Sequence, residues 1–273
     1  MSQSYSVLMS VYHKEKPEYL RESMESIYNQ TVPTDNFVLV CDGPLNPPLD
    51  EVIAEMQEKF GDRLYVHRLA KNGGLGNALN EGMTKCKNEL IARMDSDDIA
   101  RPDRCEKQLR LFAHHPEYSI VGGIVEEFSK DIHHINARRV VPEKQQDIIR
   151  FAKRRNPFNH PCVMYRKSVV QKLGGYWKYK VEDYNLWVRM LQNGYQGYNM
   201  QEPLLWMRAG EDMYKRRGDW KDFLSQKRLF KYMYDSHFIS ITEYVLIIAI
   251  RMGAVLTPNF MRAFLFKTLL RKK

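Results

Sequence analysis

Short apolar runs alternate with amphipathic segments through the first hundred residues, and this alternation limits the possible folds more than any other feature of the sequence. The apolar runs that predict β-strands are 5–11, 37–41, 64–68 and 90–94. The segments with apolar residues at helical spacing are 17–28, 52–60 and 75–83. Strands that alternate with single helices predict right-handed crossovers, so we expect an α/β fold with a mainly parallel sheet flanked by helices.

The second half of the chain is less regular. Strands are expected at 120–125 and 162–165, and a helix is expected at 183–192. The glycine pairs Gly122-Gly123 and Gly174-Gly175 are interpreted as turns. Because no repeat, low-complexity tract or flexible linker interrupts the chain, we expect one continuous globule rather than two independent domains.

The positive charge of the chain is concentrated at one end. The 273 residues carry a net charge of +9, and residues 206–273 contain 14 lysines and arginines against 6 aspartates and glutamates, which is +8 of that total. A basic segment of this kind suits nucleic acid, an anionic membrane or phosphorylated substrates. Composition alone leaves all three partners open.

Composition and spacing exclude several other classes of protein. The hydrophobic share of 44% excludes wholesale disorder, and no run approaches the roughly 18 apolar residues of a membrane-spanning helix. The first residues lack the basic and apolar regions of a secretory signal. Cys41, Cys86, Cys105 and Cys162 lie too far apart for a zinc motif or a disulfide framework. These features predict a soluble protein of the cytoplasm.

Polar residues follow each of the first four predicted strands. They are Ser10-Val11-Tyr12, Asp42-Gly43-Pro44, Asn72-Gly73-Gly74-Leu75-Gly76 and Asp95-Ser96-Asp97-Asp98. Ligands of parallel sheets bind beyond the carboxyl ends of the strands, so all four segments are candidates for a binding site. Taken singly, the second segment is typical of a turn and the third of a helix start, and neither matches a phosphate-binding glycine fingerprint.

The segment from Asp95 to Asp98 is the strongest local signal. Three carboxylates within four residues repel one another unless a cation neutralises them, and carboxylate oxygens at a strand end suit Mg²⁺ or Mn²⁺. The alternative is an acidic helix N-cap, because a helix is expected to start near Pro102. Glu182-Asp183 carries a similar ambiguity, since an aspartate at a helix start is a common cap but could also act as a general base.

Taken together and in order, these segments resemble the inverting GT-A glycosyltransferases of family 2, over roughly residues 5–210. The matching residues are Ser10-Val11-Tyr12, Asp42-Gly43, Asn72-Gly73, Ala78, Asn80, Gly82, Arg93 to Asp98, and Glu182 to Trp187. The segments 155–161 and 210–218 are similar to bacterial enzymes that build exopolysaccharide of the amylovoran type and O-antigen repeat units. In that subgroup the donor is typically a UDP-hexose and the acceptor an undecaprenyl-diphosphate-linked sugar.

The resemblance implies a donor-binding set of Ser10, Val11, Tyr12, Asp42, Asn72, Gly73, Arg93, Asp95 and Arg217. The backbone near Val11 and the carboxylate of Asp42 would hold uridine, with a cysteine preceding Asp42 where many relatives carry a second acid. Asp97, together with Asp95, would bind a divalent metal, Mn²⁺ or Mg²⁺, that bridges the diphosphate. Asp183 would be the catalytic base for single displacement of galactose or glucose, which converts an α-linked donor into a β-linked product.

The resemblance also divides the chain. It implies a glycosyltransferase domain at 1–215, with a nucleotide-binding half at 1–100 and an acceptor half at 101–215, and a basic amphipathic helical extension at 216–273. Lys215-Arg216-Arg217 would close over a diphosphate as part of a lid at 207–218, or else form a solvated basic loop. The extension would either contact the inner face of the cytoplasmic membrane or pack on the domain.

Two other functions fit parts of the sequence. A sugar nucleotidylyltransferase has a related sheet, but its glycine-rich N-terminal signature is absent here. A nucleic-acid-binding protein would use the positive charge, but the acidic loop would repel phosphate unless a metal is bound, so no nucleic-acid partner is expected.

Overall fold

The computed structural model describes residues 4–209 and 220–256. Its strands are β1 (Tyr5–Val11), β2 (Asn36–Cys41), β3 (Leu64–Arg68), β4 (Leu90–Asp95), β5 (Ile99–Ala100), β6 (Tyr118–Phe128), β7 (Ile135–Arg139), β8 (Met164–Arg166) and β9 (Gln196–Arg208). Its α-helices are α1 (Pro17–Tyr28), α2 (Pro47–Phe60), α3 (Leu75–Met83), α4 (Arg104–His114), α5 (Gln145–Ala152), α6 (Lys167–Lys172), α7 (Glu182–Gln192), α9 (Trp220–Asp235) and α10 (Ile241–Leu256). Short 3₁₀ turns lie at Gly61–Arg63 and His160–Cys162.

The strands form one mixed sheet in the order β3-β2-β1-β4-β8-β6-β9-β5, with β7 paired to β6. The pairs β1–β2, β1–β4, β2–β3 and β6–β9 are parallel, and β8 is antiparallel to both β4 and β6. The expected α/β fold is confirmed, and the alternation of strands and helices in the first hundred residues is as the sequence predicts.

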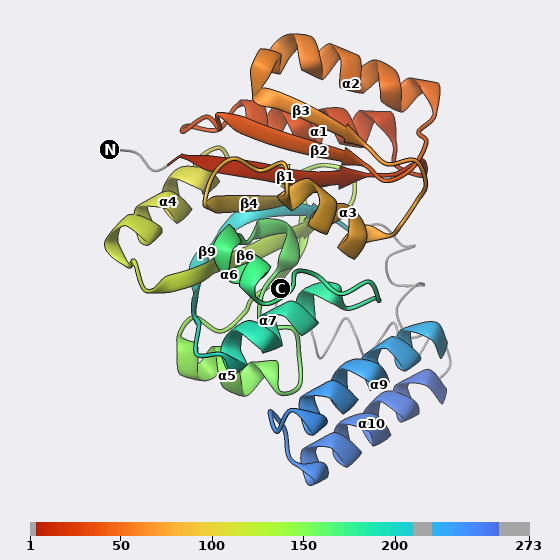
Figure 1. Ribbon diagram of the computed structural model, residues 1–273, viewed down its shortest axis with the longest axis vertical. Helices are drawn as coiled ribbons and strands as arrows, with labels where there is room; N and C mark the ends of the chain where they lie inside the picture. Colours follow the sequence, from red (N-terminus) through yellow and green to blue (C-terminus); the bar gives the residue numbers. More distant parts are fainter. Residues whose placement is uncertain (1–3, 210–219, 257–273) are drawn as a thin grey trace.

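Helices cover both faces of the sheet because side chains of a strand point alternately to its two faces. On β1, Val7 and Met9 join a buried core with α1, α2 and α4. Leu8, which points the other way, joins a second core with α3, α5, α6 and α7. The layers are visible in Figure 1, where α2 and α3 lie on opposite sides of the strands.

The pair Gly122-Gly123 lies inside β6, so the interpretation of these glycines as a turn is wrong. Both are needed because β9 and its neighbours pack against them. A Cβ on Gly122 would lie 2.4 Å from Asn199 Oδ1, and one on Gly123 would lie 2.5 Å from Leu204 Cδ1. Glycine in a strand can therefore signal close packing of a neighbour as well as a turn. Gly174-Gly175 does lie in the connection after α6, and both residues have positive φ.

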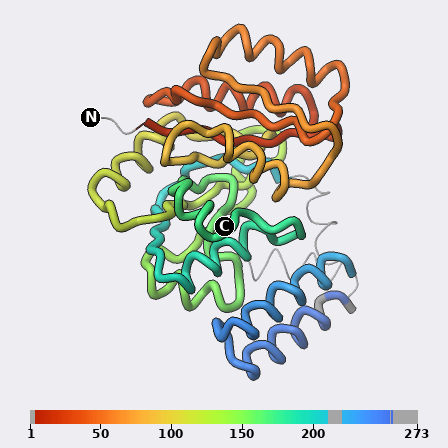
Figure 2. Tube along the Cα trace, in the orientation of Figure 1, coloured from red at the N-terminus to blue at the C-terminus, as the bar shows by residue number. Residues whose placement is uncertain are grey.

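The helical C-terminal part of the prediction is confirmed for residues 220–256. Helices α9 and α10 lie side by side at the end of the molecule away from β2 and β3, and Figure 2 shows their chain trace as a hairpin. A third buried core joins Tyr184 and Val188 of α7 to Leu229, Phe230 and Met233 of α9 and Ile247 of α10. Within the described ranges, no helix is both long enough and apolar enough to cross a membrane.

Candidate active site

Register between the parallel strands brings their carboxyl ends to one edge of the sheet. Ser10 is the partner of Asp95 across β1 and β4, and Val11 is the partner of Cys41 across β1 and β2. The backbone N–H of Asp42 then donates to the carbonyl of Val11 at 2.8 Å. The polar segments that follow these strands are therefore neighbours in space.

Asp42 fixes the glycine loop that starts α3. Its carboxylate is buried, and its two oxygens accept hydrogen bonds from the backbone N–H groups of Gly73 at 2.7 Å and Gly74 at 3.0 Å. The side-chain amide of Asn72 donates to the Asp42 carbonyl at 3.1 Å. Gly43 adopts φ +87, and a Cβ there would lie 2.6 Å from the Asn72 nitrogen. Each carboxylate oxygen retains acceptor capacity, so a contact to a nucleobase stays a prediction.

The acidic segment after β4 gathers three carboxylates. One oxygen from each of Asp95, Asp97 and Asp98 lies within 4.8 Å of the others. Burial, and then the charges of Asp95 and Glu15, raise the pKa of Asp97 to about 7. Burial also raises the pKa of Asp98 well above its usual value, with Asp97 and Asp95 adding to the effect.

The acidic segment is fixed by hydrogen bonds with residues of α1 and of the loop before it, and it does not start a helix. Ser23 Oγ donates to the Asp95 carbonyl at 2.8 Å, and Ser96 Oγ donates to Glu15 Oε2 at 2.6 Å. The short strand β5 follows directly, and α4 begins only at Arg104. The interpretation of this segment as a helix N-cap is therefore wrong. Three mutually repelling carboxylates with oxygen donors fit a hard divalent cation such as Mg²⁺ or Mn²⁺.

Arg208, the last residue of β9, donates two hydrogen bonds to the acidic segment. Its backbone N–H donates to Asp98 Oδ1 at 2.8 Å, and its Nε donates to the Asp97 carbonyl at 3.1 Å. The remaining oxygen of Asp98 is buried and accepts no hydrogen bond within the described residues. The lid expected at 207–218 starts too early, because Met207 and Arg208 are the last residues of β9. That strand mixes polar and apolar residues and was not predicted, so this position of Arg208 was not expected.

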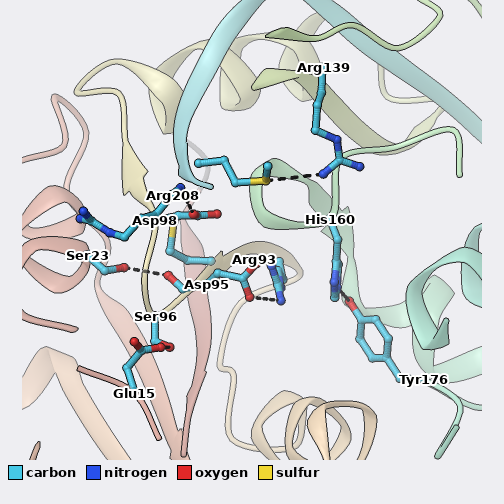
Figure 3. Close-up of polar contacts among 12 residues, drawn as sticks. Glu15, Ser23, Arg93, Asp95, Ser96, Asp98, Arg139, His160, Tyr176 and Arg208 are labelled. Carbon is cyan, nitrogen blue, oxygen red and sulfur yellow. Dashed lines mark hydrogen bonds and ion pairs between the residues drawn. The ribbon is translucent and has the colours of Figure 1, made fainter. Parts of the chain in front are cut away.

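Arg93 is a buried cation at the centre of the site. Its side chain pairs with the Asp95 carboxylate, while Nε and Nη1 have no hydrogen-bond partner in the described part of the chain. Figure 3 shows Arg93 between Asp95 and the pair formed by His160 and Tyr176. Burial raises the pKa values of both Asp97 and Asp183, and the positive charge of Arg93 offsets part of that increase at each of them.

Glu182 and Asp183 form the first turn of α7. Burial raises the pKa of Glu182 to about 7, and the charges of Asp183 and Asp95 add to that increase. Burial also raises the pKa of Asp183, although Asn156, whose side-chain amide donates to Asp183 Oδ2 at 2.6 Å, acts in the opposite direction. The two acidic segments are thus within electrostatic reach of each other, with Arg93 acting on both. Asn156 belongs to the segment 155–161 that resembles exopolysaccharide enzymes, but its pattern indicates no particular role.

Several other predicted residues have defined positions. Ser10 is the half-buried penultimate residue of β1, and Tyr12 follows the strand with its ring centroid 5.7 Å from that of His13. His160 is buried against Tyr176 and Trp187, and burial holds its pKa well below the usual value, so it is a neutral part of an aromatic cluster. Arg139 of β7, which the sequence did not single out, acts on the pKa of Asp183. Arg217, its basic neighbours and residues 257–273 lie outside the described residues.

Solved structures with the same fold bind nucleotide sugars. One of them is TarS 1–349 from S. aureus in complex with UDP-GlcNAc. The chain superposes on it with a TM-score of 0.67 at 17% identity, covering 97% of this chain and 75% of that one. It covers 44% of a longer TarS chain. The mannosyltransferase PcManGT from Pyrobaculum calidifontis, in complex with GDP-Man and Mn²⁺, superposes with a TM-score of 0.67 at 13% identity, covering 98% of this chain and 79% of that one. These likenesses confirm the GT-A fold.

Three sequence relatives are far more similar. An uncharacterized glycosyltransferase of Haemophilus influenzae is 41% identical over 98% of this chain and 99% of its own length. The amylovoran biosynthesis glycosyltransferase AmsE of Erwinia amylovora is 40% identical over 83% of this chain and 84% of its own length. The UDP-Gal:alpha-D-GlcNAc-diphosphoundecaprenol beta-1,3-galactosyltransferase of Escherichia coli is 35% identical over 98% of this chain and 97% of its own length. The model of the family described as glycosyl transferase family 2 matches residues 6–174. With a family match over more than half of its length and relatives of this identity, the chain belongs to glycosyl transferase family 2.

Proposed function

We propose that the protein transfers a hexose, galactose or glucose, from a UDP-sugar to a lipid-diphosphate-linked saccharide during bacterial exopolysaccharide, capsule or O-antigen synthesis. The observation that carries the proposal is the cluster of Asp95, Asp97 and Asp98, whose carboxylate oxygens lie within 4.8 Å of one another at the edge where the carboxyl ends of β1, β2 and β4 meet. The names of the Erwinia and Escherichia relatives support the class of product and of acceptor.

The donor nucleotide is assigned to the carboxyl ends of β1 and β2. Ser10, Val11 and Tyr12 would offer backbone and side-chain groups to uridine, and Asp42 would accept the imide proton of uracil. Asn72 and Gly73 would line the same pocket, since both are bonded to Asp42. Support comes from their position at the sheet edge where parallel sheets bind ligands.

Asp95 and Asp97 would hold a divalent cation, Mn²⁺ or Mg²⁺, which when bound supplies Lewis-acid stabilisation of the charge that develops on the leaving diphosphate. Asp98 has a different role, because one of its oxygens already accepts from the backbone of Arg208. It orients the segment, while Arg93 pairs with Asp95 and fixes the direction of that carboxylate.

Asp183 is the proposed catalytic base. An acceptor hydroxyl is a weak nucleophile, so a carboxylate must take its proton as it attacks the anomeric carbon. The raised pKa of Asp183 strengthens it as a base, and the hydrogen bond from Asn156 orients it. Attack from the side opposite the leaving UDP is a single displacement, which inverts the anomeric configuration.

The C-terminal helices are proposed to contact an anionic membrane surface at the inner face of the cytoplasmic membrane, where a lipid-linked acceptor would lie. The outward half of α10 carries Ile241, Val245, Leu246 and Ile250, whose exposed fractions are between 51% and 63%. Large exposed apolar surfaces of this kind are typical of interaction sites. The sequence that follows α10 holds five lysines and arginines and no acid between 257 and 273, which suits anionic lipid headgroups.

Family membership favours glycosyl transfer over the two alternatives. A sugar nucleotidylyltransferase would release pyrophosphate rather than UDP, so the products distinguish these two reactions. A nucleic-acid-binding role draws support only from the net charge of +9, and the acidic segment opposes it.

The overall reaction is tested with UDP-galactose and UDP-glucose against a soluble GlcNAc-diphosphate-alkyl acceptor. We expect one of the donors to release UDP only when the acceptor is present. A chelator should lower the rate by about 100-fold or more, because the developing charge loses its counter-charge, and added Mn²⁺ or Mg²⁺ should restore it. Release of pyrophosphate, or full activity in the chelator, would contradict the proposal.

Substitution of the base separates chemistry from binding. Asp183→Asn keeps the size of the side chain but cannot accept the proton, so kcat should fall by about 100-fold or more, while the affinity for UDP measured by calorimetry stays within about twofold. Asp147→Asn, an exposed carboxylate on α5, serves as the control and should behave as the unmodified protein. Near-normal turnover by Asp183→Asn would remove this residue from the mechanism.

Membrane contact is tested by flotation with vesicles of phosphatidylglycerol and phosphatidylcholine. The double variant Val245→Glu/Ile250→Glu places two charges on the exposed face of α10 and should weaken binding by about tenfold or more, since each side chain loses roughly 1.5–3 kcal/mol of apolar burial. Val140→Glu, at an exposed valine elsewhere, is the matched control. Equal flotation of the double variant and the control variant would contradict the proposed membrane contact.

A further inference from the structure

The connection between α6 and α7 determines where the acidic pair lies, because Glu182 and Asp183 are the first two residues of α7. The last residue of this connection, Val181, has φ 65 and ψ 28. A β-branched residue is rarely found in this left-handed conformation, which persists only when the surrounding structure enforces it. The contacts that enforce it therefore act on the position of the proposed base.

Helix α3 holds one side of the connection. The side chain of Asn80 accepts from the backbone N–H of Tyr176 at 2.8 Å and donates to the Tyr176 carbonyl at 2.9 Å. Gly76 of α3 leaves room for Trp177, since a Cβ on Gly76 would lie only 2.0 Å from the Trp177 carbonyl oxygen. These contacts of α3 fix the connection at Tyr176 and Trp177.

Helix α9 holds the other side. The ring of Tyr232 meets that of Trp177 edge-on, with centroids 5.4 Å apart and an interplanar angle of 76°. The guanidinium of Arg228 lies 3.9 Å from the centroid of the Tyr179 ring. One turn separates Arg228 from Tyr232 along α9, so both side chains lie on the face that meets the connection.

The same helix also contacts α7 itself. Phe230 of α9 meets Tyr184 edge-on at 6.1 Å, and Tyr184 is adjacent to Asp183 in the first turn of α7. Helix α9 thus contacts the chain on both sides of the acidic pair, at Trp177 and Tyr179 before it and at Tyr184 after it.

We infer that Arg228 and Tyr232 of α9 are positioning residues for the Glu182–Asp183 pair, acting through Tyr179 and Trp177. The C-terminal hairpin is then part of the active-site architecture as well as a surface for docking. This inference rests on the proposed function, because it assigns a consequence for turnover to the placement of Asp183. The described residues assigned to the donor nucleotide lie at the ends of β1, β2 and β4 and before α3, and none of them belongs to α9. Substitutions on α9 should therefore change turnover more than donor affinity.

The test measures kcat, the KM for the UDP-sugar and the affinity for UDP with a soluble acceptor and no vesicles, so that membrane contact plays no part. Tyr232→Ala and Arg228→Ala should each lower kcat by about tenfold or more, because a small displacement of a base has a large effect on rate. The KM for the donor and the affinity for UDP should stay within about twofold. Tyr232→Phe keeps the ring and should restore turnover.

Matched controls lie on the same helix. Tyr234→Ala removes a ring that stacks on Tyr244 rather than on the connection, and Lys227→Ala removes a neighbouring exposed cation. Both should keep normal kcat. Equal losses in test and control variants, or a parallel loss of UDP affinity, would overturn the inference while leaving transfer by the unmodified protein intact. Absence of transfer by the unmodified protein would instead overturn the proposed function, and this inference with it.

Discussion

Arg93 carries a positive charge inside the protein, and burial of such a charge is tolerable only where carboxylates surround it. Its partner Asp95 belongs to the same strand, so the pair is built by β4 alone. The charge also reaches Asp97 and Asp183, which lie in the acidic segment and on α7. A single buried guanidinium therefore lies within electrostatic range of both acidic groups that the proposed reaction needs.

The sheet topology makes that arrangement possible. Strand β8 runs antiparallel between β4 and β6 and joins the regular first half of the sheet to the second. The long strand β9 then returns beside β6 and ends at Arg208, which bonds to the acidic segment. The hairpin of α9 and α10 packs on α7, so the end of the described chain contacts the element that carries Asp183. Segments far apart in the sequence thus meet at the acidic segment and at α7.

The sequence predicts the first half of the fold well because each strand and helix there is a local periodic pattern. It also indicates which residues follow the strands, since chain order alone determines that Asp42 and Asp95 come after β2 and β4. It fails where a residue owes its position to distant contacts. Gly122 lies in β6 at a place where Asn199 leaves no room for a Cβ, and Arg208 bonds to Asp98 across 110 positions of sequence. The role of an individual side chain depends in the same way on distant groups, because these determine how it meets a substrate.

The proposed mechanism requires a carboxylate of α7 to face the anomeric carbon from the side opposite the leaving diphosphate. The anomeric configuration of the transferred sugar reports that relation most directly. Proton NMR of the purified product, made from an α-linked UDP-hexose, should show a β-linked sugar. An α-linked product would mean that the new bond forms on the face from which UDP departs, and Asp183 could not then be the base described here.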